Sequence, residues 1–166
     1  YRFVPTGSLL EEKITLTVAR KLTAQTNVVK ASDAGAGDWF GWDMAVSGST
    51  LVVAAPYEDS NTSGVGNVST DYNSGAVYVY IVENGNIREQ AKLKASNAEG
   101  VGDHSNNDPV DNDGGGDGFG WAVAIDGDTI AVSAIREDSN ATGINGNESD
   151  NSTQNAGAVY IFTRSG

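Results

Sequence analysis

One long pattern occurs twice in this chain, and that repetition limits the possible folds more than any other sequence feature. Each copy contains an aromatic-glycine segment, an apolar run, the tetrapeptide Glu-Asp-Ser-Asn and a second apolar run that begins Gly-Ala-Val-Tyr. These segments are 38–42, 51–56, 58–61 and 75–80 in the first copy, and 117–121, 130–135, 137–140 and 157–162 in the second. A repeated unit usually cannot bury its apolar face alone. We therefore expect units that pack on one another.

The apolar periodicity predicts β-strands. Alternating apolar residues at 40–46 and 119–125 predict a strand with one buried face in each repeat. Gly-containing tight turns then lead into 50–55 and 129–134, runs apolar enough to be covered on both faces. The remaining predicted strands are 75–80, 157–162 and the more polar outer segment 87–95. The expected fold is all-β, with four-stranded antiparallel meanders.

The N-terminal part predicts one further outer strand. Residues 25–32 resemble residues 90–96, whereas no outer strand follows the last run of the second repeat. Upstream, the alternation in 14–18 favours a strand over the helix that a capping box at 8–11 would start. The expected divisions are an arm with the start of a donor strand at 1–27, a first repeat at 28–96, and a second repeat at 97–166 with an acidic insertion at 103–117.

Composition excludes several classes of partner. A net charge of -12 would repel phosphate backbones and anionic lipid headgroups, so neither nucleic acid nor a membrane surface is expected. No apolar run is long enough to span a bilayer. The chain starts at Tyr1 rather than Met, which a removed secretion signal would explain. With no cysteine and a single histidine, His104, in a polar loop, we expect no enzymatic activity.

Acidic residues suggest a cation site. In a meander, the long loops of both repeats lie at one end of the strands, so their carboxylates should gather there. The candidate calcium ligands are Glu58, Asp59, Asp108, Asp111, Asp113, Asp117, Glu137 and Asp138. The spacing is not that of an EF-hand, and two alternatives remain: a solvated acidic loop, and turns in which Asp, Ser and Asn bind nearby backbone amides.

Aromatic residues divide into two groups. Phe40, Trp42, Phe119 and Trp121 stand at matched strand positions in both repeats, so we expect them in the core. Trp39 has no aromatic counterpart, because Gly118 occupies that place in the second repeat. Trp39 is therefore the better candidate for an exposed contact.

The motifs resemble the FG-GAP repeat, the blade unit of integrin α-subunit β-propellers and of many bacterial surface proteins. Phe40-Gly41 and Ala54-Ala55-Pro56 match the pattern closely; the second copy keeps Phe119-Gly120 but has Ser133-Ala134-Ile135. The resemblance implies propeller-like blades, an extracellular setting, secreted or on a cell surface, and adhesion or ligand binding. The family's Asp-rich calcium loop is not matched, because the turns at 47–49 and 126–128 are too short to carry it.

Two blades are too few to close a propeller, which typically has four to eight. Open sheet edges template pairing with another chain, so we expect the N-terminal strand of one copy to complete the second blade of the next. The predicted function is an extracellular structural or adhesive protein that self-assembles head to tail, as a fibre or a ring. The alternative is a fragment of a larger, calcium-dependent propeller that recognises protein or glycan.

Overall fold

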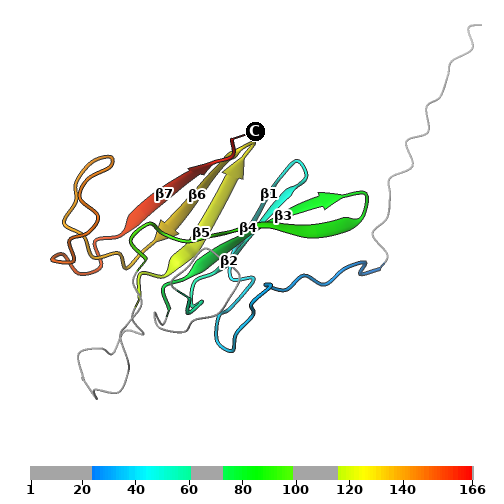
Figure 1. Cartoon of the computed structure of the whole chain (residues 1–166), viewed down its shortest axis with the longest axis horizontal. Coiled ribbons are helices and arrows are strands. Elements are labelled where there is room, and N and C mark those ends of the chain that lie inside the picture. Colours follow the sequence, from blue (N-terminus) through cyan, green and yellow to red (C-terminus); the bar gives the residue numbers. More distant parts are fainter. Residues whose placement is uncertain (1–23, 61–72, 99–115, 166) are drawn as a thin grey trace, which may run out of the picture.

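The computed structural model describes residues 24–60, 73–98 and 116–165, and there the chain forms two antiparallel sheets (Figure 1). The first sheet has the order β1-β2-β3-β4 and the second β5-β6-β7. The strands are β1 (Met44–Ser47), β2 (Thr50–Ala55), β3 (Ala76–Glu83), β4 (Asn86–Leu93), β5 (Phe119–Asp126), β6 (Thr129–Ala134) and β7 (Ala158–Thr163). No helix in the described ranges could cross a membrane. The predicted all-β meanders are confirmed.

Short turns join neighbouring strands at one end of each sheet. Asn84 and Gly85 both have positive φ, 52° and 82°, as a two-residue type I′ hairpin requires, and they connect β3 to β4. Gly48 and Gly127 have φ values of 56° and 55° in the turns between β1 and β2 and between β5 and β6. The long polar connection between β6 and β7 lies at the opposite end of the second sheet (Figure 1).

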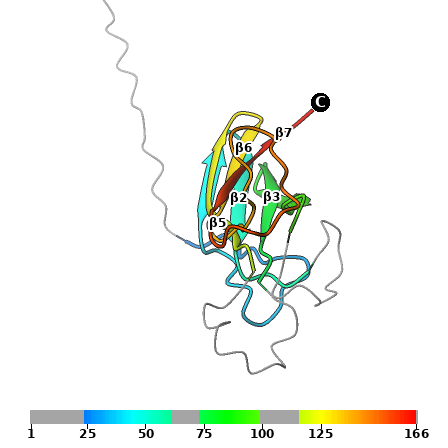
Figure 2. The ribbon, with the colours of Figure 1, turned by 90° about the vertical axis from the view of Figure 1, so that its left-hand side faces the viewer.

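The two sheets pack face to face, and their contact is the main core (Figure 2). From the first sheet, Val52 and Val77 are fully buried in this cluster; from the second, Phe119 and Val132 are. Because β2 is also covered on its other face, it is buried almost throughout, as its apolar run predicts. The central strand of the second sheet, β6, alternates buried and more exposed residues, so only one of its faces is covered.

The N-terminal segment covers the other face of the first sheet. Val29 and Ala31 pack with Tyr78 and Tyr80 of β3, and the Tyr80 hydroxyl donates a hydrogen bond to the Lys30 carbonyl. Within the described chain this segment forms no ladder with a strand; residues 25–32 were expected to be an outer strand whose partner is a second copy. A strand exists only with a hydrogen-bonded neighbour, and this segment touches β3 through side chains.

The first strand is shorter than the alternation at 40–46 predicts. It begins only at Met44, because Gly41 has a φ of 93° and both Gly41 N–H and Trp42 N–H donate to the Ala54 carbonyl. The predicted burial is also wrong: Trp42, Met44 and Val46 are 45%, 61% and 69% exposed. Their counterparts in β5 pack against the first sheet, whereas no described residue covers β1 in this way.

Candidate functional site

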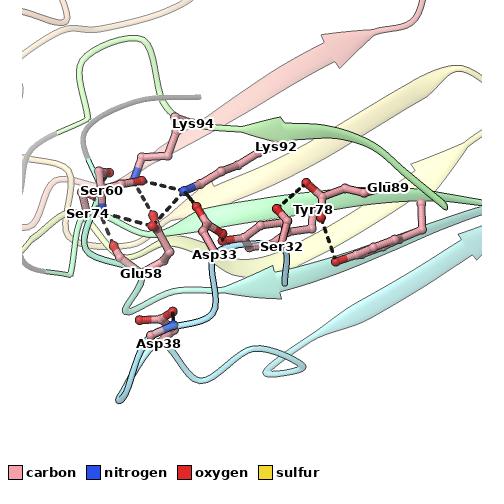
Figure 3. Close-up of polar contacts among 12 residues, drawn as sticks. Ser32, Asp33, Asp38, Glu58, Ser60, Ser74, Tyr78, Glu89, Lys92 and Lys94 are labelled. Carbon is pink, nitrogen blue, oxygen red and sulfur yellow. Dashed lines mark hydrogen bonds and ion pairs between the residues drawn. The ribbon is translucent and has the colours of Figure 1, made fainter. Parts of the chain in front are cut away.

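A buried ionic cluster lies where the first sheet meets the loop end of the repeat (Figure 3). Lys92, on β4, contacts Asp33 at 2.7 Å and Glu58 at 2.8 Å, and Lys94 contacts the other Glu58 oxygen at 3.0 Å. All four side chains are at most 4% exposed. Ser60 and Ser74 accept further hydrogen bonds from Lys92 and Lys94, at 2.6 Å each. Two carboxylates are thus matched by two ammonium groups.

The lysines set the ionisation of this cluster. Burial alone would raise the pKa of Glu58, but the charge of Lys94 and the hydrogen bond from Lys92 more than offset it, so the pKa is lowered. Burial likewise opposes ionisation of Asp33, and hydrogen bonds from Lys92 and Tyr78 hold its pKa below its ordinary value. Burial raises the pKa of Asp38, whose carboxylate accepts the Gly35 N–H. Glu58 and Asp33 are therefore stable anions inside the fold.

The second repeat has the same carboxylate without the lysines. Glu137, the counterpart of Glu58, is 2% exposed. It accepts hydrogen bonds from the Asn97 side-chain amide at 3.0 Å and from the Ser139 hydroxyl at 3.0 Å. Asn97, the counterpart of Asp33, also accepts the Tyr160 hydroxyl. No salt bridge to Glu137 occurs among the described residues, since the second sheet ends at β7 without a fourth strand.

The candidate calcium ligands divide into two sets. Asp108, Asp111 and Asp113 lie outside the described residues, so the proposed calcium loop stays a prediction. Among the others, both Glu58 oxygens are bound by lysines. Asp59 accepts the Asn73 N–H, and Asp138 accepts the Asn155 N–H. These contacts join each aspartate to a backbone amide 14 and 17 residues further along the chain, so they close the long loops without an ion.

Within each repeat, several of the described carboxylates lie near one another. Glu58, Asp59 and Asp33 all act electrostatically on Asp38 in the first repeat. In the second repeat, Glu137, Asp117 and Glu148 all contribute to raising the pKa of Tyr160, behind its burial. Even so, the described residues contain no group of three or more His, Cys, Asp or Glu side chains placed to hold a metal. The described carboxylates therefore do not fit a calcium site by themselves.

The two repeats meet at a glycine junction. A Cβ on Gly75 would lie 2.1 Å from the Phe119 carbonyl oxygen, and a Cβ on Gly120 would lie 2.9 Å from the Ala76 carbonyl oxygen. The Phe119 N–H donates to the Ser74 carbonyl across this junction. The Phe-Gly and Gly-Ala dipeptides are thus where one repeat's backbone touches the next, and only glycine leaves room for it.

The same positions are open at the two ends of the unit. A Cβ on Gly41, the counterpart of Gly120, would have no atom within 4 Å. A Cβ on Gly157, the counterpart of Gly75, would lie 3.4 Å from its nearest atom, the Ile135 carbonyl oxygen. The outer faces match this pattern. Val159 and Ile161 on β7 are 66% and 62% exposed, although their counterparts on β3 are buried against the second sheet.

A cluster of aromatic rings lies beside the start of β1. Trp39 stacks on Trp42 with ring centroids 5.4 Å apart, and contacts Tyr57 at 4.4 Å. Trp42 also packs on Trp121 at 5.0 Å and donates its indole N–H to the Trp121 carbonyl. Trp39 is 54% exposed, as expected for a contact residue, and has a φ of 55° where Gly118 has 63°. A non-glycine residue in this left-handed region is strained.

Sequence reasoning missed the lysines and their partners. Lys92 and Lys94 stand two positions apart at the end of a segment predicted to be a polar outer strand, and outer position alone gives no reason to expect them to be buried. Two signals in the sequence could have revealed them. The first repeat contains Lys-x-Lys at 92–94 in addition to the repeated Glu of Glu-Asp-Ser-Asn, and it has Asp33 at the position that corresponds to Asn97. Those residues form the most buried polar cluster of the first repeat.

Comparison of the sequence with known protein families agrees with this geometry. The family model for the FG-GAP repeat matches residues 23–80 and 110–162, which together make up more than half of the chain. No curated protein matched the chain. The four-stranded and three-stranded antiparallel sheets are those of propeller blades, in agreement with the matched family. The chain belongs to the FG-GAP repeat family.

Proposed function

We propose that this protein is an extracellular structural or adhesive element that assembles head to tail. In this assembly, the outer face of the second sheet of one copy receives the first sheet of the next. Residues 24–29 of the incoming copy pair with the edge of β7 that no described strand occupies, and become the fourth strand of that sheet. A repeating contact of this kind produces a ring if its rotation closes and a fibre if it does not.

The internal junction between the repeats supports this proposal. It joins a face of β5 to a face of β3, and the corresponding faces of β1 and β7 are exposed at the two ends of the unit. In the internal contact, Val123 and Ile125 of β5 pack against the sheet that contains Val77 and Val79. Met44 and Val46 are the β1 counterparts of the first pair, and both are exposed. Docking these residues on Val159 and Ile161 would repeat the contact already made inside the molecule.

The observation that carries the proposal is the exposure of two apolar faces whose counterparts pack against each other inside the molecule. Burial of apolar surface contributes about 25 cal/mol per Å², so large exposed apolar groups at matched positions favour association. Backbone pairing along β7 would add affinity and set the register. The open spaces above Gly41 and Gly157 also leave room for the close backbone approach that the internal junction makes.

Sedimentation velocity across the micromolar range, followed by electron microscopy, tests the proposal. The full chain is expected to form rings or filaments, and a chain without residues 1–30 is expected to stay monomeric. Deletion of residues 1–23 alone is the matched control, because it leaves the donor strand 24–29 and Lys30 in place and should still assemble. A full chain that remains monomeric at all concentrations would overturn the proposal.

The aromatic cluster favours a second candidate function, ligand binding on the loop side of the first repeat. Trp39 keeps an exposed ring at a strained backbone position, and strain retained at the surface often marks a binding site. A glycan is the favoured ligand class, because flat exposed rings suit sugar faces and the acidic surface disfavours anionic ligands. Titrating tryptophan fluorescence with cellohexaose or chitohexaose, with Trp39→Ala as the comparison, tests this function; an unchanged spectrum at millimolar sugar counts against it.

Calcium enters both candidates through the acidic insertion at 103–117. FG-GAP repeats often bind calcium, and closely spaced Asp side chains on a glycine-rich segment suit this hard cation. Isothermal titration with calcium chloride is expected to give a binding signal that Asp111→Asn with Asp113→Asn removes. Repeating the sedimentation experiment with a chelator then shows whether assembly needs the ion.

A further inference from the structure

Glu137 stands out among the buried acids because its neighbours only partly compensate its charge. It is 2% exposed, and its described hydrogen-bond donors are an amide and a hydroxyl, from Asn97 and Ser139. Glu58, at the same place in the first repeat, contacts two ammonium groups. A buried carboxylate is costly unless a cation accompanies it. The second repeat is therefore built for a positive group that the described residues do not supply.

The position of that group follows from the first sheet. Lys92 is paired opposite Tyr78, and Lys94 lies two residues further along, so both ammonium groups reach Glu58 from the fourth strand. The counterpart of Tyr78 is Tyr160 on β7, which pairs with β6 on one edge and with no described strand on the other. A strand that paired with β7 in the same register would place its side chains at the same two positions beside Glu137.

Residues 28–34 match this requirement in sequence. They read Val-Val-Lys-Ala-Ser-Asp-Ala, against Lys-Leu-Lys-Ala-Ser-Asn-Ala for residues 92–98. Lys30 therefore corresponds to Lys94, and Val28 corresponds to Lys92. The Lys30 side chain is exposed and makes no hydrogen bond or ion pair with a described residue. It is available to a partner molecule.

The number of charges also matches. In the first repeat, the carboxylates of Asp33 and Glu58 face two lysines. In the second repeat, Asn97 replaces the aspartate and donates its amide directly to Glu137, so of these two positions only Glu137 carries a carboxylate. A strand with valine at the first position and lysine at the second supplies one cation. Residues 28–34 fit the second repeat better than a copy of residues 92–98 would.

We propose that Glu137 is a selective docking site for Lys30 of a second copy, and that this ion pair fixes which strand completes the second sheet and in which register. This inference rests on the proposed head-to-tail assembly and names the contact that gives it specificity. A strand without a lysine at this position would bury Glu137 unpaired, and a strand shifted by one residue would turn Lys30 to the opposite face.

Sedimentation of the full chain and three variants tests the ion pair. Lys30→Met keeps the aliphatic stem but removes the charge, and should weaken assembly roughly 30-fold or more, since truncating one partner leaves the other buried alone. Lys30→Met combined with Glu137→Gln should recover most of this loss, because neither charge is then buried unpaired. Arg88→Met, which removes an exposed positive charge from β4, is the control and should assemble like the unaltered chain.

The outcomes separate the two levels of the proposal. If the unaltered chain does not assemble, the head-to-tail function fails and the ion pair fails with it. If the unaltered chain assembles and Lys30→Met assembles equally well, only the ion pair is overturned. If Lys30→Met is weak but the double variant is no stronger, Lys30 acts through contacts other than Glu137, which also overturns the pairing.

Discussion

At the scale of single residues, the first repeat depends on charges that are almost fully shielded from solvent. Lys92 is 3% exposed at its side chain and has three acceptors, on Asp33, Glu58 and Ser60. Every buried side-chain nitrogen or oxygen in the described ranges has a hydrogen-bond partner. A fully satisfied network of this kind holds the N-terminal segment, β4 and the Glu-Asp-Ser-Asn loop in one arrangement.

Removing Lys92 should therefore destabilise the fold strongly. Lys92→Met leaves Glu58 with one cation and Asp33 with none, and breaking a buried pair in this way typically costs about 3–5 kcal/mol. Urea denaturation followed by tryptophan fluorescence would measure the change. Arg88→Met on the same strand is exposed and should change the free energy of unfolding by less than about 0.5 kcal/mol. Equal losses in the two variants would mean that the cluster contributes little.

The same cluster predicts a loss of stability in acid. The pKa values of Glu58 and Asp33 are lowered by folding, so their contribution is fully present above the unfolded values of 4.5 and 3.8. It is lost as the pH falls through the lower folded values. Asp38 acts in the opposite sense, because burial raises its pKa and its protonation on acidification relieves a cost.

Urea titrations from pH 7 to pH 2 would reveal this profile. The free energy of unfolding should change little down to about pH 5 and then fall. Asp38→Asn should make the fall steeper, since the opposing group is gone. A free energy that rises steadily from pH 5 to pH 3 would contradict the assignment of Glu58 and Asp33 as stabilised anions.

At the scale of elements, strands were predicted well and their surroundings less well. The apolar runs and glycine turns were sufficient to place β2, β3, β4 and β6, because period and turn chemistry are local properties. The start of β1 could not be placed in this way, since positive φ at Trp39 and Gly41 breaks an alternation that looks regular in sequence. The burial of β1 also failed, because it depends on a neighbouring sheet and not on the strand.

The glycine junction gives an internally controlled test of how the sheets pack. Gly75→Ala would place a methyl group 2.1 Å from the Phe119 carbonyl, whereas Gly157→Ala has a similar φ but no contact below 3.4 Å. Left-handed strain of about 1–2 kcal/mol is common to both substitutions. Gly75→Ala should be the more destabilising by at least about 2 kcal/mol, through the forced separation of backbones. Unfolding in dilute solution would measure the difference, and equal effects would contradict a tight junction.

At the scale of the whole molecule, two packed sheets leave apolar residues exposed at both ends of the unit, on β1 and on β7. The proposal of head-to-tail assembly could be made from the order of strands alone, because an outer strand was expected before the first repeat and none after the second. The proposed charge match could not, because it depends on the burial of Glu137 and on the Asn97 amide beside it. Such relations require the depth of each side chain, which strand periodicity does not determine for polar residues.

The exposed face of the second sheet provides the last prediction. Val159→Asp with Ile161→Asp places two charges where a second copy would dock, so assembly should be abolished through desolvation and loss of apolar contact. The protomer should unfold at nearly the same urea concentration, because both side chains already face solvent. Ile144→Asp is the matched control: Ile144 is 92% exposed, lies in the loop between β6 and β7, and should leave assembly unchanged. Assembly that survives the double substitution would show that copies meet through some other surface, and the complementary faces would then need a different partner.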